Sequence, residues 1–154
     1  MIDTREDILA RLLTLAATVP NIQFTDRNNA DVVDTELPAL IIFDGDEETD
    51  DATLPMRIPS SVTLVRMHPI IELVAMSAIA GSDLSALRRG LLKLVLYDTQ
   101  LNDNIVKTGM NTGRPANGAI RYLGCQTDPT WMRNKKGQMR VQFLFKYKLN
   151  PADL

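Results

Sequence analysis

The amino-acid sequence predicts a single α+β domain, with a mostly antiparallel sheet and two α-helices on one face of it. Two segments show the three-and-four apolar spacing of amphipathic helices, and one long segment near the C-terminus alternates apolar and polar residues as a half-buried strand does. The chain has 154 residues, which is a usual length for one domain, and we expect residues 1–154 to form one. At this length a core needs no disulfide or metal.

The first helix is predicted over Thr4–Val19. Thr4 and Asp7 have the spacing of a capping box in its acidic form, and Pro20 ends the helix because proline cannot continue it. The apolar residues that recur along one face are Ile8, Leu9, Leu12, Leu15, Ala16 and Val19.

Two strands are predicted after this helix. A short one covers Asn21–Thr25 and is followed by a polar segment rich in turn residues. The run Leu37–Phe43 is continuously apolar, and its length and β-branched content predict a strand buried on both faces. The acidic residues 44–51 predict a loop, and we expect the chain to stay irregular as far as Pro59.

A long strand is predicted over Val62–Ala75. Its apolar side consists of Val65, Met67, Ile71, Leu73 and Ala75. Its polar side consists of Arg66, His68 and Glu72. Pro69 lies inside this strand, and because proline cannot donate a backbone hydrogen bond it predicts an edge strand, a bulge or a bend.

The second helix is predicted over Asp83–Tyr97, with Ser82 as its N-cap. Its buried face consists of Leu84, Leu87, Leu91, Leu94 and Val95. Gly90 costs about 1 kcal/mol there relative to alanine, and we interpret it as a point of close approach to the sheet. Residues 98–117 are predicted to be mostly loop.

Two strands complete the predicted fold, at Ala119–Gln126 and at Gln138–Leu149, joined by a polar link over 128–137. In the last strand the odd positions are apolar and nearly all even positions are polar, which predicts one buried and one wet face. We expect both helices and the sheet to share one core that contains Leu9, Leu12, Ile41, Phe43, Leu73, Leu91, Val141, Phe143 and Phe145.

Charge is distributed unevenly along the chain. Residues 1–54 hold 13 acidic and 3 basic residues, and residues 55–154 hold 6 acidic and 14 basic residues, although the net charge is only −2. Such asymmetry is compatible with nucleic-acid binding or an acidic tail, and with two halves that neutralise each other inside one fold. It is also compatible with self-complementarity, in which an acidic edge of one copy meets a basic edge of the next.

The sequence favours an intracellular protein. Cys125 is the only cysteine, so no intrachain disulfide can form, and this suits a reducing compartment. The first residues lack the basic-then-apolar order of a signal peptide, and charged residues interrupt every long apolar stretch. We therefore expect a cytoplasmic location and no membrane contact.

Motifs for catalysis, cofactors and metals are missing from the sequence. His68 is the only histidine, so the usual Cys/His zinc spacings and the common nucleophile arrangements cannot be built. Gly109, Gly113 and Gly118 share one segment, but no apolar strand precedes them and no helix follows, as phosphate binding requires. We expect no catalytic residues, no cofactor and no metal, with His68 in solvent or in an interface.

One acidic segment imitates a calcium loop without completing it. Asp44, Asp46 and Glu48 match the first three ligand positions of an EF-hand. Thr49 occupies the place of the turn glycine, and the glutamate of the twelfth position is missing. A solvated or partner-facing loop is therefore the preferred interpretation.

One basic segment imitates a nucleic-acid site. Arg133, Lys135 and Lys136 lie near Trp131, which suits phosphate contact combined with base stacking. The pI of about 5.4 is well below the basic value of such domains, so a basic rim facing an acidic protein surface fits better. Trp131 is either an anchor of that interface or a cover for the edge of the core.

The order of these features resembles that of the tail terminator and tail-completion proteins of long-tailed bacteriophages, and of similar proteins in prophages and gene transfer agents. The features are the amphipathic helix Thr4–Val19, the run Leu37–Glu48, the long strand Val62–Ala75, the helix beginning at Ser82 and the amphipathic strand Gln138–Leu149. The match in order extends over nearly the whole chain.

The resemblance implies a structural virion protein that assembles in the host cytoplasm as a ring, typically a hexamer. Such a ring caps the tail tube and offers a docking surface to the head-side connector, so the implied partners are itself, the tail tube protein and a neck protein. Nucleic acid would not be contacted specifically. The implied contact segments are residues 44–60, 108–117 and 128–137.

The candidate interaction residues are the charged and aromatic side chains of these segments, namely Asp44, Asp46, Glu47, Glu48, Asp50, Asp51, Arg57, Arg114, Trp131, Arg133, Lys135 and Lys136. Three alternatives remain open. One is a head–tail connector or neck subunit of the same particle, and another is a nucleic-acid-binding module. The third is a small enzyme with an atypical site built from Asp44, Asp46, His68 and Arg66.

Overall fold

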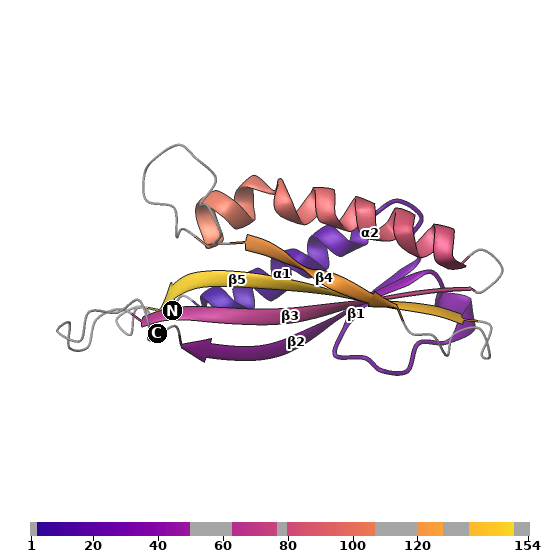
Figure 1. Ribbon diagram of the computed structural model, residues 1–154, viewed down its shortest axis with the longest axis horizontal. Helices are drawn as coiled ribbons and strands as arrows, with labels where there is room; N and C mark the ends of the chain where they lie inside the picture. The colour runs from indigo at the N-terminus through magenta and orange to yellow at the C-terminus, as the bar shows by residue number, and fades with distance from the viewer. Residues whose placement is uncertain (1–2, 50–62, 77–79, 107–119, 128–135, 150–154) are drawn as a thin grey trace.

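The computed structural model describes residues 3–49, 63–76, 80–106, 120–127 and 136–149. The elements in chain order are α1 (Thr4–Ala17), β1 (Phe24–Arg27), the short helix η1 (Asp34–Glu36), β2 (Ala39–Thr49), β3 (Thr63–Met76), α2 (Ala80–Leu96), the π-helical turn η4 (Gln100–Ile105), β4 (Ile120–Thr127) and β5 (Lys136–Leu149). The strands form one sheet, and both main helices lie on the same side of it (Figure 1). The predicted α+β class is confirmed.

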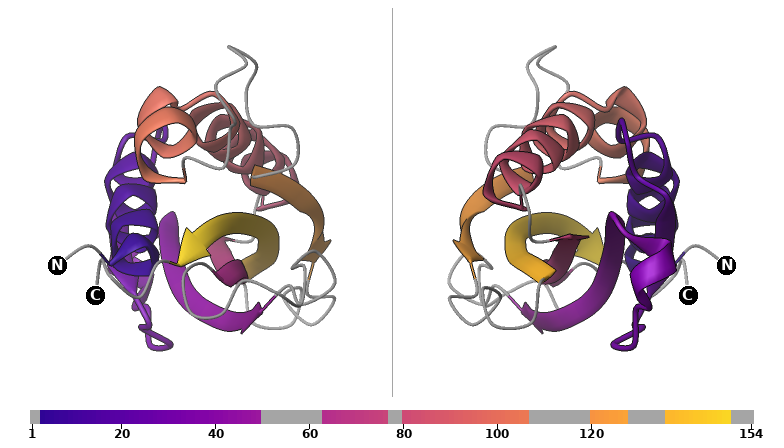
Figure 2. Two further views of the ribbon diagram at one scale, coloured as in Figure 1. Left: turned by 90° about the vertical axis from the view of Figure 1, so that its left-hand side faces the viewer. Right: turned by 90° about the vertical axis from the view of Figure 1, so that its right-hand side faces the viewer.

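The five strands follow the order β1-β2-β3-β5-β4. The pairs β2–β3, β3–β5 and β5–β4 are antiparallel, and only β1 pairs with its neighbour in parallel. The two end-on views of Figure 2 show that the sheet curves strongly, with α1 beside β2 and α2 nearer β4. No helix in the described parts of the chain is long and apolar enough to cross a membrane.

The helix α1 begins one residue earlier than the capping prediction assumed. The side chain of Asp3, not of Thr4, is the N-cap, because its carboxylate accepts a hydrogen bond from the backbone N–H of Glu6 at 3.1 Å. The helix ends at Ala17, and the backbone N–H of Thr18 bonds to the carbonyl of Leu15. The buried face is the predicted one.

One core lies between the helices and the sheet. Its largest fully buried side chains include Tyr147, Phe143, Phe145, Ile8, Leu9, Leu12, Leu40, Ile42, Met67, Ile71 and Leu73. Ile41 and Phe43 were also predicted in this core, and that part of the prediction is wrong. Leu40 and Ile42 belong to the core, so the alternation of strand side chains directs Ile41 and Phe43 to the opposite face.

The strand β2 continues through the acidic residues that were predicted to form a loop, so the loop prediction is wrong for residues 44–49. A β-bulge between Phe43 and Asp46 shifts the register by one residue, and the second half of β2 stays paired with β3. Gly45 lies in the bulge with φ of +69° opposite Pro69, which lacks a backbone donor. The bulge is thus the outcome that Pro69 predicted, although β3 is a central strand.

The helix α2 begins at Ala80, so Ser82 lies inside its first turn and is not the N-cap. Gly90 was predicted to lie close to the sheet, and this prediction is wrong, because its near neighbours are Val19 and Pro20. A β-carbon built on it would lie 3.4 Å from Cγ1 of Val19 and 3.6 Å from Cδ of Pro20, which follow α1. Leu94 is only partly buried, while the rest of the predicted stripe is buried.

The segment after α2 was predicted to be loop, but residues 100–105 form the turn η4. Leu101 and Val106 are buried in the common core, which explains why this segment is ordered against the helices. The segments 108–117 and 128–135, which we expected to be contact loops, lie outside the described residues. Residues 136 and 137 belong to β5.

Candidate assembly surface

The face of the sheet opposite the helices, called here the outer face, carries most of the charged side chains of the strands. Because strand side chains alternate, the residues that belong to the core fix which ones face outward. Charged residues of the outer face include Asp46 and Glu48 of β2, Arg66, His68 and Glu72 of β3, Arg140, Lys146 and Lys148 of β5, and Arg121 of β4.

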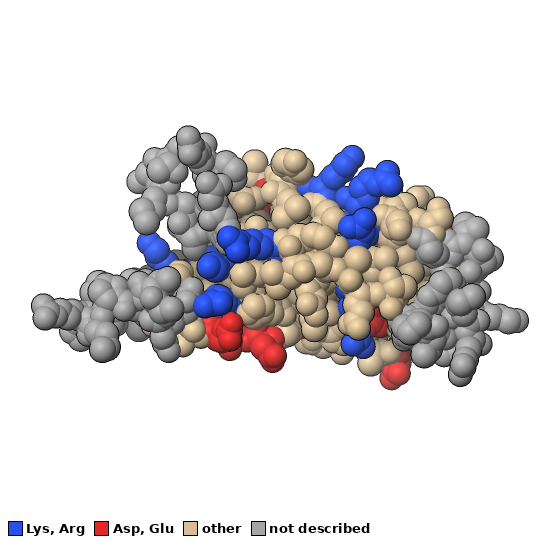
Figure 3. Space-filling model, viewed as in Figure 1, with Lys and Arg blue, Asp and Glu red and all other residues tan. Residues whose placement is uncertain are grey.

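One end of the outer face holds acid and base side by side. Glu48, Arg66 and Lys146 lie in register across β2, β3 and β5. The carboxylate of Glu48 lies 3.9 Å from Nη1 of Arg66 and 3.3 Å from Nε2 of His68. Figure 3 shows a cluster of acidic side chains directly beside basic ones toward this end of the molecule. Acidic and basic side chains therefore lie on neighbouring strands at this end of the outer face.

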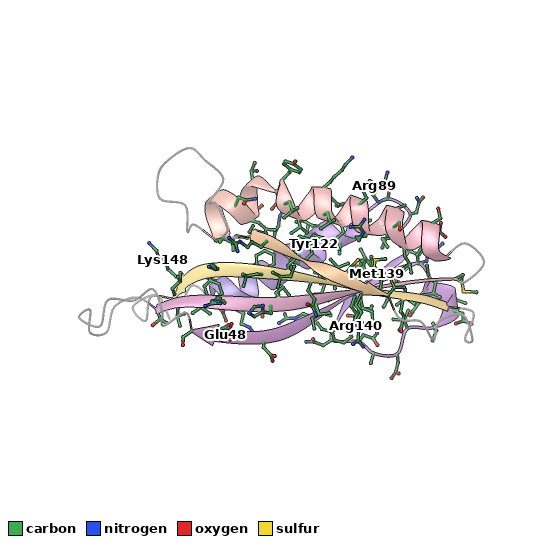
Figure 4. The ribbon with its side chains drawn as sticks, viewed as in Figure 1. Glu48, Arg89, Tyr122, Met139, Arg140 and Lys148 are labelled. Atoms are coloured by element: carbon green, nitrogen blue, oxygen red, sulfur yellow. The ribbon has the colours of Figure 1, made fainter. Side chains whose placement is uncertain are left out.

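The other end of the outer face has a smaller polar cluster around Glu72. Its carboxylate accepts a hydrogen bond from the amide nitrogen of Gln138 at 2.9 Å, and Nε of Arg140 lies 3.4 Å from it. The side chain of Glu72 is 15% exposed and that of Arg140 is 61% exposed. In Figure 4, Arg140 lies toward this end of the sheet, and Glu48 and Lys148 toward the first.

Two of the predicted interaction residues point inward and are held within the chain. Asp44 accepts hydrogen bonds from Nε and Nη2 of Arg27 at 2.6 and 2.8 Å, and Arg27 also pairs with Glu6 of α1. These bonds from Arg27 hold the pKa of Asp44 below its usual value. Asp44 thus links β2 to β1 and, through Arg27, to α1.

Glu47 is the second inward residue. It accepts a hydrogen bond from the hydroxyl of Tyr147 at 2.8 Å, and Nε of Arg5 lies 3.2 Å from the same carboxylate oxygen. Burial, followed by this bond to Glu47, raises the pKa of the Tyr147 hydroxyl. The contact joins β5 to β2 and α1 beneath the acidic end of the sheet.

Three of the remaining predicted interaction residues lie in described strands. Asp46 and Glu48 are exposed on the outer face, as an interaction role requires. Lys136 is the first residue of β5. The other candidates lie outside the described residues, namely Asp50, Asp51, Arg57, Arg114, Trp131, Arg133 and Lys135.

The residues of the alternative enzyme site fall into two separate sets of contacts. Asp44 bonds to Arg27 on the helix side, whereas Arg66 and His68 lie against Glu48 on the outer face. Within the described ranges, no three His, Cys, Asp or Glu side chains come close enough together to hold a metal ion. The incomplete calcium pattern at residues 44–49 is part of a strand.

Several internal ion pairs neutralise part of the charge asymmetry. All three basic residues of the first 54 are paired, because Arg5 lies beside Glu47, Arg11 beside Asp98 and Arg27 beside Glu6 and Asp44. The pair Arg11–Asp98 joins the two halves of the chain. Part of the acidic charge of the first 54 residues is therefore neutralised inside the chain. The outer face still exposes charged side chains of the strands.

Sequence reasoning missed the contribution of the edge strand β4. Arg121 is exposed there, and its side chain makes no ion pair within the described residues. The signal was present in the alternation of Ile120, Arg121 and Tyr122, which places Arg121 on the wet side of a strand. Lys146 and Lys148 were placed on the polar side of the last strand, but no role was assigned to them.

A shallow pocket on the helix side was also missed. It has a volume of about 310 Å³ and lies between the segment after α1, Pro38 and α2. Its lining residues are Pro20, Asn21, Pro38, Asp83, Ala86, Leu87 and Gly90. Because these residues come from three distant segments, no local sequence pattern indicates the pocket.

Comparison with models of known protein families matches none of them, and comparison with curated proteins likewise finds no match.

Proposed function

We propose that this chain is a structural, non-enzymatic subunit of a bacteriophage-type tail, a terminator or completion protein that forms a ring on the tube. The ring, of six copies in the family that the sequence resembles, caps the tube and presents a surface to the head-side connector. Its partners are further copies of itself, the tail tube protein and the neck protein. It acts in the host cytoplasm during assembly and at the head-proximal end of the tail afterwards.

The observation that carries this proposal is the separation of charge across one end of the outer face. A ring requires two different, complementary patches on each subunit. The exposed acids Asp46 and Glu48 lie at the β2 side, and the exposed bases Lys148 and Arg121 lie toward the β4 side. Complementary patches of this kind set register and partner choice more than affinity.

Two further observations support a binding role over a catalytic one. Ion pairs of the outer face each include a side chain that is more than half exposed, Glu48 at 58% and Arg140 at 61%. Small-molecule sites use instead an enclosed apolar cavity with a few convergent polar groups. The inward acids Asp44 and Glu47 are occupied by arginines of the same chain. A neck or connector subunit of the same particle is the second candidate, since it needs the same kind of surface.

The test is genetic and structural. Particles that lack the gene are imaged by electron microscopy and their tail lengths are measured. A terminator predicts tubes of irregular, extended length without attached heads, and complementation with the wild-type chain restores normal tails. A neck subunit predicts tails of normal length that fail to join heads. Normal tails joined to heads in the absence of the chain overturn both proposals.

A further inference from the structure

The second half of β2 and the strand β4 form two free edges of the sheet. The strand β1 pairs with β2 only along Ala39–Ile42, so among the described residues no strand covers the far side of residues 46–49. Among the strands that the structure describes, β4 is the last in the sheet and pairs with β5 alone. Unpaired backbone groups on such edges are templates for pairing with another chain.

These two edges carry opposite charge. The β2 edge holds Asp46, Glu47 and Glu48, with the side chain of Asp46 in no ion pair within the described ranges. The β4 edge holds Arg121 as its one ionic residue. Arg121 pairs with Leu144 of β5. Lys146 lies two residues after Leu144 on the same face, so it adds a second basic side chain near this edge.

The directions of the strands also match. Each of the steps from β2 to β3, β5 and β4 is antiparallel, so β4 runs opposite to β2. When two copies lie side by side in the same orientation, β4 of one and β2 of the other therefore meet as an antiparallel pair. Both segments lie at the same end of the sheet, since Glu48 is in register with Lys146 through Arg66.

The bulge in β4 limits how far such pairing can extend. The register of β4 against β5 shifts between Tyr122 and Gly124, and Gly124 has φ of +129°. Bulges bend the strand and end a ladder locally. A strand of another copy could not pair with Ala39–Ile42, because β1 already occupies that side of β2. The bulge in β4 therefore ends the pairing segment of β4 before it would meet β1.

We propose that copies of this chain join head to tail by pairing residues 120–123 of β4 with residues 46–49 of β2 in the next copy. This inference rests on the proposed ring and names its interface. Contacts between two acidic edges or between two basic edges are repelled by like charge, so charge selects the head-to-tail arrangement. The same charges keep the free edges from pairing indiscriminately before assembly.

The experiment uses charge reversal on exposed side chains of the two edges. The variants are Asp46→Lys and Arg121→Glu, and the matched controls are Asp31→Lys and Arg89→Glu, which reverse exposed charges away from both edges. Arg89 lies on α2, on the helix side of the molecule (Figure 4). Each full-length chain is mixed with assembled tail tubes of its particle at low salt, and ring mass is measured by native mass spectrometry.

Each edge variant alone is expected to lose assembly by at least about tenfold, because like charges meet at every interface. An equal mixture of the two variants is expected to recover rings. In the mixture, lysine at 46 and glutamate at 121, which are diagonal neighbours on one face of the paired strands, carry opposite charges at one interface, and the native combination forms at the alternate one. Hydrogen exchange should show new protection of the amides at 46–49 and 120–123 on assembly.

The outcomes separate this inference from the proposed function. If the wild type forms rings and both edge variants form them equally well, the edge pairing is overturned and the ring proposal stays in place. Loss of assembly in both variants without recovery in the mixture also overturns the pairing. A wild-type chain that never assembles on tubes overturns the ring and the interface together.

Discussion

Gly45 and His68 approach each other so closely that a β-carbon on residue 45 would lie 1.8 Å from the carbonyl oxygen of His68. Gly45 also has φ of +69°, a conformation that side chains other than glycine rarely adopt. The contact lies in the β-bulge where β2 passes Pro69, and beyond it the acidic half of β2 continues along β3. The position of Asp46 and Glu48 on the outer face thus depends on a residue without a side chain.

We therefore predict that Gly45→Ala strongly destabilises the protein. The positive φ alone costs about 1–3 kcal/mol for a residue with a β-carbon, and the backbone clash adds to it because no flexible side chain can move aside. Urea unfolding monitored by circular dichroism measures the change. A Gly45→Ala variant as stable as the wild type contradicts the bulge geometry.

Gly90→Ala is predicted to have the opposite effect. A β-carbon there meets Val19 and Pro20 at ordinary contact distances of 3.4 and 3.6 Å. Alanine is favoured over glycine inside a helix by about 1 kcal/mol, so the free energy of unfolding should rise by about 0.5–1 kcal/mol. The same unfolding experiment tests this prediction, and a loss of stability would show that residue 90 has no room for a methyl group beside Val19 and Pro20.

Phe143→Ala is predicted to cost about 3–5 kcal/mol of stability, because Phe143 is fully buried and leaves a cavity. Its ring lies against Phe145 and Tyr122, with centroids 6.2 and 6.1 Å away. Tyr97→Ala is the control, since Tyr97 is 81% exposed and should change stability by less than about 0.5 kcal/mol. Similar costs for the two variants would contradict the assignment of the core.

The pair Arg11–Asp98 predicts a pH-dependent contribution to stability. Nη2 of Arg11 lies 2.7 Å from Asp98, which also accepts the backbone N–H of Leu101, so the pair anchors η4 to α1. Hydrogen bonds from Arg11 lower the pKa of Asp98 in the folded state. The stabilisation is therefore complete at neutral pH and is lost as the pH falls from about 4 through the lowered pKa.

Arg11→Gln should accordingly cost about 1–3 kcal/mol at pH 7, and the difference from the wild type should shrink toward pH 3. Urea unfolding of both proteins at several pH values measures this. Asp98→Asn is the matched control, because it removes the titrating carboxylate and should flatten the same part of the profile. A difference that is constant with pH contradicts the role of this pair.

Elements with a clear period were predictable from the sequence. The buried faces of β5, α1 and α2 were predicted from the spacing of their apolar residues. A two-residue period fits a strand and a three-and-four spacing fits a helix, so each spacing indicates one kind of element. The face to which Ile41 points was not predictable, since a strand apolar on both sides lacks alternation. Asp3 and Thr4 are both capable N-caps, and only the bond to Glu6 distinguishes them.

The acidic segment shows why the candidate surface was only partly predictable. Its composition is that of a loop, and pairing with β3 outweighs this local preference. Asp46 on the outer face and Glu47 on the helix face are neighbours with the same chemistry, and the bulge at Gly45 decides which of them lies on which face. A bulge changes the register by one residue and reverses every later side chain.

Assembly of this chain into a ring on the tail tube can be tested by the mass of the particle that it forms. Light scattering or native mass spectrometry is carried out with and without tail tubes, at low and high salt. We predict a closed multiple of the 17.2 kDa subunit at tube ends, and weaker assembly at high salt because surface charges are screened. A chain that remains a monomer with tubes present, together with normal tail length in its absence, would rule out the ring.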